Sequence, residues 1–202
     1  MKILVFDTET TWFIDKKETS LEKQPYIIQF AWIVWELKDW KFSEIRRIND
    51  FVKPKISIPF WASQVHHIYD IDVKNAPSIE DKIDDFLWII NSCDAIIWHN
   101  VEYDEEMIKL ELKRLWRLFD YQPKQVLCTM KSTVDFCALK WNWERFKYPK
   151  LWELYKKLFW EYFIWAHDAI VDVEATLKAF LELEKLWILK LNQNKQEVLS
   201  LF

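Results

Sequence analysis

The sequence predicts one α/β domain in which helices cover a mixed, five-stranded sheet. Two observations carry this prediction: strand-like runs come first along the chain and most helix-like runs come later, and no repeat or linker divides them. A chain of 202 residues is also long enough for one domain to bury a sizeable core. We therefore expect a single layered domain.

Five short runs rich in β-branched and aromatic residues predict the strands. The first run is apolar and typical of a buried central strand. The second and third are separated by Asp39 and Trp40, where we expect a hairpin turn. The fourth belongs to "CDAIIWHN" and the fifth to "QVLCTM". The expected strands are residues 2–6, 26–35, 44–52, 95–97 and 125–130.

Further runs predict helices, and the first of them carries its apolar residues on one stripe. That stripe consists of Ile79, Ile83, Phe86, Leu87 and Ile90. Before this helix, Pro54, Pro59 and Pro77 predict a loop region that includes "ASQVHHIYDI". The expected helices are residues 79–91, 103–118, 131–139, 150–159 and 168–186.

Composition and charge exclude several classes of protein. No apolar run approaches the length of a membrane span, and the N-terminus lacks a charged-then-apolar signal, so we expect no membrane partner. The three cysteines form no CxxC pair, which argues against a disulfide framework or a zinc site and favours the cytoplasm. The net charge of -4 argues against a broad nucleic-acid-binding surface, but a nuclease with an acidic metal site is compatible with it.

The sequence contains no glycine and 14 tryptophans. Average usage of about 7% predicts roughly 14 glycines in a chain of this length. Trp40 follows Asp39 where a hairpin favours Asp-Gly, and Trp187 falls at a helix end, where a left-handed glycine is common. We therefore expect that most of these tryptophans replace natural glycines because UGA codons are read as glycine; glycine-free engineering is the alternative. Trp32, inside an apolar run, is expected to be a true core residue.

Three segments far apart in the sequence carry acidic residues beside a strand end or on a helix. Asp7 and Glu9 follow the first predicted strand and point to the same side, because a strand repeats every two residues. Asp104 begins a predicted helix, and His167 lies five residues before Asp172 near the start of the last helix. Carboxylates are the ligands of hard divalent cations. This set predicts a metal site with a histidine base beside it.

The motifs around these acids resemble those of the DEDDh (DnaQ-like) 3′–5′ exonucleases, the superfamily of polymerase proofreading subunits and RNase T-like enzymes. "FDTETTWF" matches the D-x-E-T-T-G pattern apart from Trp12, and "WHNVEYD" matches G-H-N, an aromatic residue and Asp apart from Trp98. "WAHDAIVDVEAT" has the H-x4-D spacing of the His subgroup. "CTMKSTVDFC" and "YPKLWELYKKLFWEYF" look like a bacterial subgroup, whereas His67 replaces the usual glycine of "VHGI". The resemblance covers roughly residues 1–188.

The resemblance implies a ribonuclease H-like fold and two Mg²⁺ or Mn²⁺ ions about 3.5–4 Å apart. Asp7, Glu9, Asp104 and Asp172 would hold the ions, and Glu9 counts among the catalytic residues together with His167. An imidazole suits the role of general base because its pKa lies near the working pH.

The resemblance also implies residues that contact the substrate. Thr10 and Asn100 would hold the terminal nucleotide, and Phe13 would stack between the last bases; a position of Phe13 in the core is the equal alternative. For His66 and His67 a role in the loop is favoured over catalysis.

The expected function is removal of nucleotides from the 3′ ends of single-stranded nucleic acid, with DNA as the favoured substrate and a role in replication proofreading or repair, as in the epsilon subunit of bacterial DNA polymerase III. RNA 3′-end processing is the alternative, because nothing in the sequence identifies residues that would sense a 2′-hydroxyl. An inactive nucleic-acid-binding or polymerase-associated adaptor domain is a third possibility, although binding alone requires no complete set of metal ligands.

The sequence divides into an exonuclease domain, residues 1–188, and a C-terminal tail, residues 189–202. The tail ends in "QEVLSLF", which resembles the short peptide, roughly Q-L-S-L-F, with which bacterial polymerases and repair enzymes bind the sliding clamp. Two interpretations follow: the tail packs on the domain's own core, which is favoured, or it binds a sliding clamp, with a DNA polymerase as a further partner. The docking residues would be Gln196, Leu199, Leu201 and Phe202.

Overall fold

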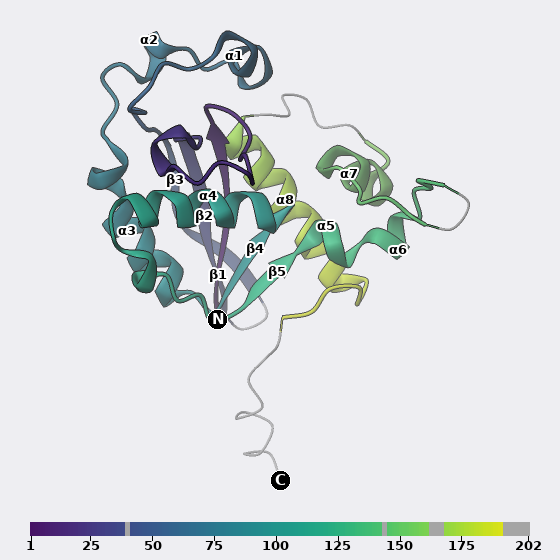
Figure 1. Ribbon diagram of the computed structural model, residues 1–202. Helices are drawn as coiled ribbons and strands as arrows, with labels where there is room; N and C mark the ends of the chain where they lie inside the picture. The colour runs from purple at the N-terminus through teal and green to yellow at the C-terminus, as the bar shows by residue number, and fades with distance from the viewer. Residues whose placement is uncertain (39–40, 143–144, 162–167, 192–202) are drawn as a thin grey trace.

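The computed structural model describes residues 1–38, 41–142, 145–161 and 168–191. A central sheet separates two layers of helices: α3 and α4 lie on one face, and α7 and α8 lie on the other (Figure 1). The expected turn at Asp39 and Trp40, the histidine at position 167 and the end of the tail from residue 192 lie outside the described residues.

The sheet has the order β3-β2-β1-β4-β5. β1 pairs with β2 and β2 with β3 in antiparallel fashion, whereas β1 with β4 and β4 with β5 are parallel. This confirms the prediction of a mixed, five-stranded sheet in one domain. The strands are β1 (Lys2–Thr10), β2 (Ile27–Lys38), β3 (Lys41–Phe51), β4 (Ala95–Trp98) and β5 (Val126–Cys128).

β1 extends four residues beyond its predicted end at residue 6. The antiparallel pairing with β2 continues up to Thr10 opposite Ile27, with a register shift between Glu9 and Thr10. Asp7 and Glu9 are therefore strand residues, and the prediction that they follow the strand was wrong. Pairing with a neighbouring strand outweighs the low strand propensity of acidic residues.

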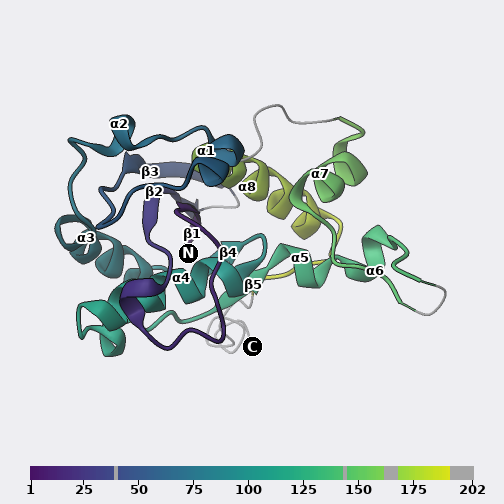
Figure 2. The same ribbon diagram turned by 45° about the horizontal axis from the view of Figure 1, so that its top comes forward.

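The helices follow the predicted order with three differences. The first difference is α1 and α2, which lie where a loop was expected, beyond the end of the sheet at which β1 ends (Figures 1 and 2). Pro59 precedes α1 directly, and proline is compatible with the start of a helix because the missing N–H has no partner there. The helices are α1 (Phe60–His66), α2 (Asp70–Val73), α3 (Ile79–Ser92), α4 (Val101–Arg114), α5 (Thr129–Ser132), α6 (Val134–Cys137), α7 (Leu151–Phe159) and α8 (Ala169–Lys185), with short 3₁₀ helices η1 (Leu21–Lys23) and η2 (Leu118–Asp120).

The other two differences concern helix lengths. α4 ends at Arg114 instead of residue 118, because Trp116 takes a left-handed backbone with φ of 58°. The helix expected over residues 131–139 is divided into α5 and α6. At Thr133 the φ of −115° is not helical and the side-chain hydroxyl donates to the Thr129 carbonyl at 2.6 Å, a bond that competes with the helix.

The alternation of β1 assigns its residues to the two faces of the sheet. Leu4 and Phe6 belong to the core under α3 and α4, whereas Ile3 and Val5 belong to the core under α8. The apolar stripe predicted for α3 is buried, and Trp32 is a core residue with 2% of its surface exposed, as expected. Because the alternation continues, the odd-numbered acids of β1 point toward α8, and the even-numbered threonines point toward α4.

Among the described residues, no helix is long and apolar enough to cross a membrane.

Candidate active site

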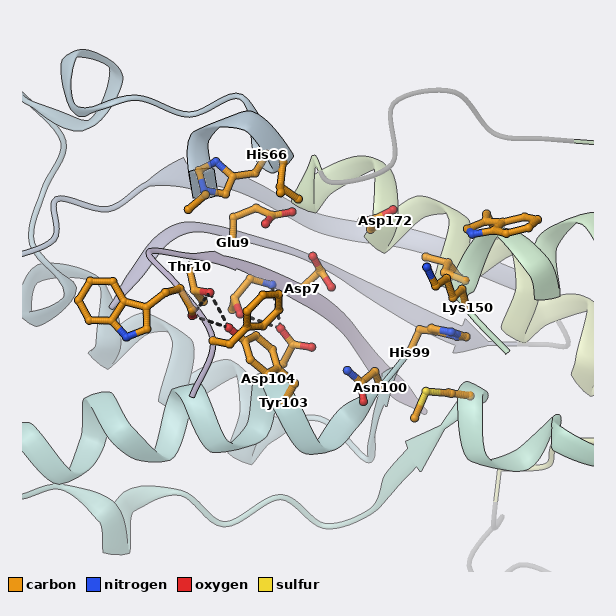
Figure 3. Close-up of a pocket in the computed structure, with 18 of the residues that line it drawn as sticks. Asp7, Glu9, Thr10, His66, His99, Asn100, Tyr103, Asp104, Lys150 and Asp172 are labelled. Atoms are coloured by element: carbon orange, nitrogen blue, oxygen red, sulfur yellow. Dashed lines mark hydrogen bonds between the residues drawn. The ribbon is translucent and has the colours of Figure 1, made fainter. Parts of the chain in front are cut away.

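A cleft of about 440 Å³ opens at the carboxyl end of β1 (Figure 3). Its walls come from six parts of the chain: the end of β1 with the loop after it, α1, the start of α4, α5, the start of α7 with the segment before it, and α8. The carboxyl ends of β1 and its parallel neighbour β4 meet at this edge, which is where open α/β sheets place their ligand sites.

Three carboxylates from two elements meet in this cleft. Asp7 and Glu9 extend from β1 and Asp172 from the first turn of α8, and ligand oxygens of all three lie within 4.8 Å of one another. This confirms the sequence expectation that Asp7 and Glu9 share one side of the strand. The fold also brings Asp172, from the last helix, close enough to the two strand acids for one cation to contact all three.

Asp104 is the fourth acid of the cleft and comes from the first turn of α4. Its Oδ1 accepts the Thr8 backbone N–H at 3.2 Å and the Thr8 hydroxyl at 2.7 Å. Thr8 is one of the even-numbered residues of β1, so it faces α4 and fixes this carboxylate, while its two neighbours face α8. In Figure 3, Asp7 lies between Asp104 and the pair Glu9 and Asp172.

The acids are held in an electrostatically unfavourable arrangement. Burial, followed by the charges of Asp104, Asp172 and Glu9, raises the pKa of Asp7 well above its ordinary value. Burial and the charges of Asp172 and Asp104 raise the pKa of Glu9 in the same way. Burial also raises the pKa of Asp104 to about 7, although the hydrogen bonds from Thr8 lower it. Asp104 is buried and the other three acids are half-buried. Carboxylate oxygens that repel one another in such a place fit a hard divalent cation, which would neutralise their charge.

Asp168 adds a fifth acidic group that the sequence did not single out. Its side chain accepts the Ile170 N–H at 3.3 Å and so caps α8, and its charge further raises the pKa of Asp7 and Glu9. Gln29 of β2 holds the same helix end: Nε2 donates to Asp168 Oδ1 at 3.3 Å, and Oε1 accepts the Ala169 N–H at 3.3 Å. These bonds fix the start of α8, which carries Asp172, against the sheet.

The residues expected to contact substrate all line the cleft. Phe13 has 74% of its surface exposed and stacks near Trp61 with ring centroids 6.2 Å apart, so the alternative of a core position was wrong. Asn100 precedes α4 with a left-handed φ of 69°, and the Thr10 hydroxyl is already engaged with the Tyr103 hydroxyl at 2.6 Å.

Sequence reasoning missed several residues of the cleft. His66 was assigned to a loop; it is buried in α1, lines the cleft and accepts the Ile68 N–H through Nδ1 at 3.1 Å. His99 bridges two remote groups, with Nδ1 3.0 Å from the Thr129 hydroxyl and Nε2 3.0 Å from the Pro149 carbonyl. Burial lowers the pKa of His99 to about 4, so the ring is neutral at neutral pH. The partners lie 30 and 50 residues away, and no local pattern points to them.

Comparison with known proteins agrees with this geometry. The family model RNase T, described as "Exonuclease", matches residues 4–180. Among curated protein sequences, none is similar enough to the chain to count as a match.

Solved structures with the same fold include three exonucleases. The nuclease domain of 3′hExo, a DEDDh family member bound to rAMP, has a TM-score of 0.68 at 16% identity, with 96% of each chain covered. Exonuclease X in complex with 5′ overhanging duplex DNA has a TM-score of 0.56 at 21% identity, with 91% of this chain and 92% of that chain covered. E. coli Exonuclease I with a dA16 oligonucleotide has a TM-score of 0.63 at 18% identity; all of this chain but only 45% of that chain is covered.

Proposed function

The chain belongs to the RNase T family of exonucleases, and from that premise we propose that it removes nucleotides one at a time from the 3′ ends of single-stranded DNA. The observation that carries this proposal is the cluster of Asp7, Glu9 and Asp172, with Asp104 beside it, at the bottom of an open cleft. Four carboxylates without a cation repel phosphate, so a site that only bound an anionic polymer would not be built from them.

We assign the cluster to two Mg²⁺ or Mn²⁺ ions held by Asp7, Glu9, Asp104 and Asp172. Bound there, such ions would lower the pKa of a water molecule and neutralise charge on the phosphate and the leaving oxygen. The protein's contribution is to hold the carboxylates in place: Thr8 orients Asp104, and the start of α8 orients Asp172. The rest of the cleft then has to place the 3′ end of the nucleic acid beside these acids.

The terminal nucleotide is assigned to the cleft wall formed by Thr10, Phe13 and Asn100. Phe13 is exposed beside the acids, and an aromatic face stacks on any base. His167 is proposed as the general base that accepts the proton of the attacking water. The support for this role is its position one residue before Asp168, which caps the helix that carries Asp172.

The choice of DNA over RNA, and the role in proofreading or repair, belong to the proposal. The solved neighbours include a DNA-bound Exonuclease X and a 3′hExo bound to rAMP, so both substrates require a direct test. A sliding clamp and a DNA polymerase are proposed partners on the strength of the tail sequence "QEVLSLF".

The experiment compares matched single-stranded DNA and RNA oligonucleotides that carry a label at the 5′ end. The expected result is a ladder of products shortened from the 3′ end on DNA in Mg²⁺ or Mn²⁺, with no products in EDTA. Asp7→Ala should abolish most of this activity, and Asp135→Ala is the matched control because Asp135 is an exposed acid outside the cleft. Full turnover by Asp7→Ala would contradict the metal assignment, and faster degradation of RNA would contradict the assignment of DNA.

A further inference from the structure

Tyr103 connects the loop after β1 to the helix that carries Asp104. Its hydroxyl lies 2.6 Å from the Thr10 hydroxyl and donates to the Trp12 carbonyl at 3.0 Å, and the Thr10 hydroxyl lies 3.0 Å from the same carbonyl. The two hydroxyl oxygens and the carbonyl oxygen thus form a triangle, and the two hydroxyl hydrogens are shared among its three contacts. We call this triangle the Tyr103 latch.

The latch lies between the acids and the exposed ring of Phe13. The ring of Tyr103 contacts that of Phe13 edge to face, with centroids 6.4 Å apart, and Asp104 is the next residue of α4. Phe13 has 74% of its surface exposed, and its ring contacts two aromatic rings, Trp61 of α1 and Tyr103 of α4. Of these two contacts, the one with Tyr103 connects Phe13 to the helix that carries Asp104.

We propose that Tyr103 is a positioning residue that holds the stacking ring of Phe13 at a set distance from the carboxylates. The inference rests on the proposed function, in which Phe13 stacks on a base near the 3′ end. A phenylalanine would keep the ring contact and lose the latch.

The test is Tyr103→Phe, assayed over a range of oligonucleotide concentrations. We expect KM to rise about 5- to 20-fold, because the loss of one or two hydrogen bonds loosens the loop. The kcat should change less than about 2-fold, since a fully bound substrate still meets the intact acids. Tyr69→Phe is the matched control, because Tyr69 lies outside the residues that line the cleft.

Two outcomes would overturn the latch. One is that neither KM nor kcat changes, and the other is a fall in kcat with KM unchanged, which would place Tyr103 in the chemical step. Thr10→Val and the double variant Thr10→Val/Tyr103→Phe complete a double-mutant cycle. In this cycle the second substitution should raise KM little beyond the effect of the first. A wild-type chain that degrades no oligonucleotide would instead refute the proposed function; the two failures are therefore distinguishable.

A separate observation concerns three helix ends. Among the described residues, six that are not glycine have positive φ, and three of these are tryptophans: Trp116 with φ of 58°, Trp160 with 60° and Trp187 with 62°. A left-handed backbone is rare for a bulky residue, because its Cβ approaches the following carbonyl oxygen. Each of the three directly follows the last turn of a helix, α4, α7 or α8.

The hydrogen bonds at these ends belong to motifs that glycine terminates. After α4, Trp116 N–H donates to the Lys113 carbonyl at 3.2 Å and Arg117 N–H to the Leu112 carbonyl at 2.8 Å, which is the Schellman pattern. The end of α8 repeats this pattern: Trp187 N–H donates to Glu184 and Ile188 N–H to Leu183, both at 3.0 Å. The end of α7 has the single bond of the αL motif, from Trp160 N–H to Lys156 at 2.9 Å.

The indole rings gain little at these positions. Trp116, Trp160 and Trp187 have 94%, 86% and 74% of their surfaces exposed, and the contact recorded for Trp187 is the Lys190 ammonium 3.9 Å from its ring centre. Burial therefore does not offset the backbone strain. We infer that residues 116, 160 and 187 are glycine in the natural chain, through UGA codons read as glycine.

The physical test replaces the three residues together as W116G/W160G/W187G. Relief of the left-handed strain, reduced by the greater entropy of unfolded glycine, should raise the Tm by about 5 °C. Trp32→Gly is the matched control: it removes a buried ring over which the Arg46 guanidinium lies 5.0 Å from the centre, and it should lower the Tm. An unchanged or lower Tm of the triple variant would overturn the inference.

The genetic test reads the codons and the peptide masses of the protein from its natural cell. We expect UGA at all three positions and peptides whose masses contain glycine there. UGG codons, or peptides with tryptophan, would show that these residues are true tryptophans.

Discussion

At the scale of single residues, the acids of the cleft lower the stability of the folded chain when no cation is bound. Each carboxyl whose pKa is raised by folding binds its proton more tightly in the folded state than in the unfolded state. Such a group contributes stability below its unfolded pKa, and this contribution is lost as the pH rises through its folded pKa. For Asp104 this window extends from its ordinary value of 3.8 to about 7.

Asp104→Asn should therefore stabilise the cation-free protein at pH 8. The amide can still accept the bonds from Thr8 and carries no charge, so the gain is on the order of 2–4 kcal/mol, or roughly 4–12 °C in Tm. The difference from wild type should shrink toward pH 4. Melting curves in EDTA across this range check the prediction, and a difference independent of pH would contradict it. Added Mn²⁺ should make wild type more stable than Asp104→Asn, because only wild type keeps all four carboxylates to bind the ion.

His167→Ala tests the second residue-scale assignment. Loss of a general base should slow the chemical step by about 10²–10⁴-fold and leave Mn²⁺ affinity unchanged. Single-turnover rates across pH, with Mn²⁺ titration as the control, measure both. A variant whose rate equals that of wild type at every pH would show that His167 is not the base.

At the scale of the elements, the alternation of β1 distributes two kinds of function. Odd-numbered Asp7 and Glu9 face α8 and meet Asp172, whereas even-numbered Thr8 and Thr10 face α4 and hold Asp104 and Tyr103. The site is therefore assembled from two helices on opposite faces of one strand. Its geometry depends on how firmly each helix is fixed to the sheet.

Gln29 offers a test of that dependence, because its amide joins β2 to the start of α8. Gln29→Leu leaves the Ala169 N–H without its acceptor and removes the bond from β2 to Asp168, so the start of α8, which carries Asp172, is held less firmly against the sheet. We expect a 10- to 100-fold loss of Mn²⁺ affinity, the usual effect of removing a group that orients a metal ligand. Asn49→Ala is the matched control, since it removes the other partner of Gln29, at 2.9 Å, and leaves both bonds to α8. Equal Mn²⁺ affinity of Gln29→Leu and wild type, measured by calorimetry, would contradict this role.

At the scale of the whole molecule, the domain keeps its cleft at one edge of the sheet. Leu189 and Leu191, which follow α8, are buried in the core under that helix, so the chain is packed on the domain up to this point. The residues proposed to bind a clamp come later in the sequence. Clamp binding and catalysis should therefore be separable.

A peptide of residues 190–202 should bind a bacterial sliding clamp with a Kd on the order of micromolar, measured by fluorescence anisotropy. The combined change Leu201→Ala and Phe202→Ala removes the apolar groups that would fill the groove and should abolish this binding. In the full chain, the same change should leave exonuclease activity on free oligonucleotides and the Tm unchanged. A clear fall in Tm would show instead that the tail belongs to the core.

Much of the fold was predictable because its patterns are local. The apolar stripe of α3, from Ile79 to Ile90, and the short buried runs of β1 and β4 repeat with the period of their element. Boundaries were harder to predict. β1 continues to Thr10 because β2 pairs with it, and α1 forms after Pro59 although three prolines suggested a loop.

The sequence by itself determined which residues could carry the chemistry. The order and spacing of Asp7, Glu9, Asp104, His167 and Asp172 are properties of the linear chain, and so is the side of β1 that the first two share. Their resemblance to one enzyme family needed no coordinates.

Only the tertiary structure decided how the site is held together. Tyr103 meets Thr10 across 93 residues, Gln29 meets Ala169 across 140, and His99 meets Pro149 across 50. The structure also exposes Phe13, for which the sequence left core and surface equally open. The physical reason is that such contacts join single polar atoms of different elements and have no period along the chain. They exist only once the packing of helices on the sheet has brought those elements within hydrogen-bond distance.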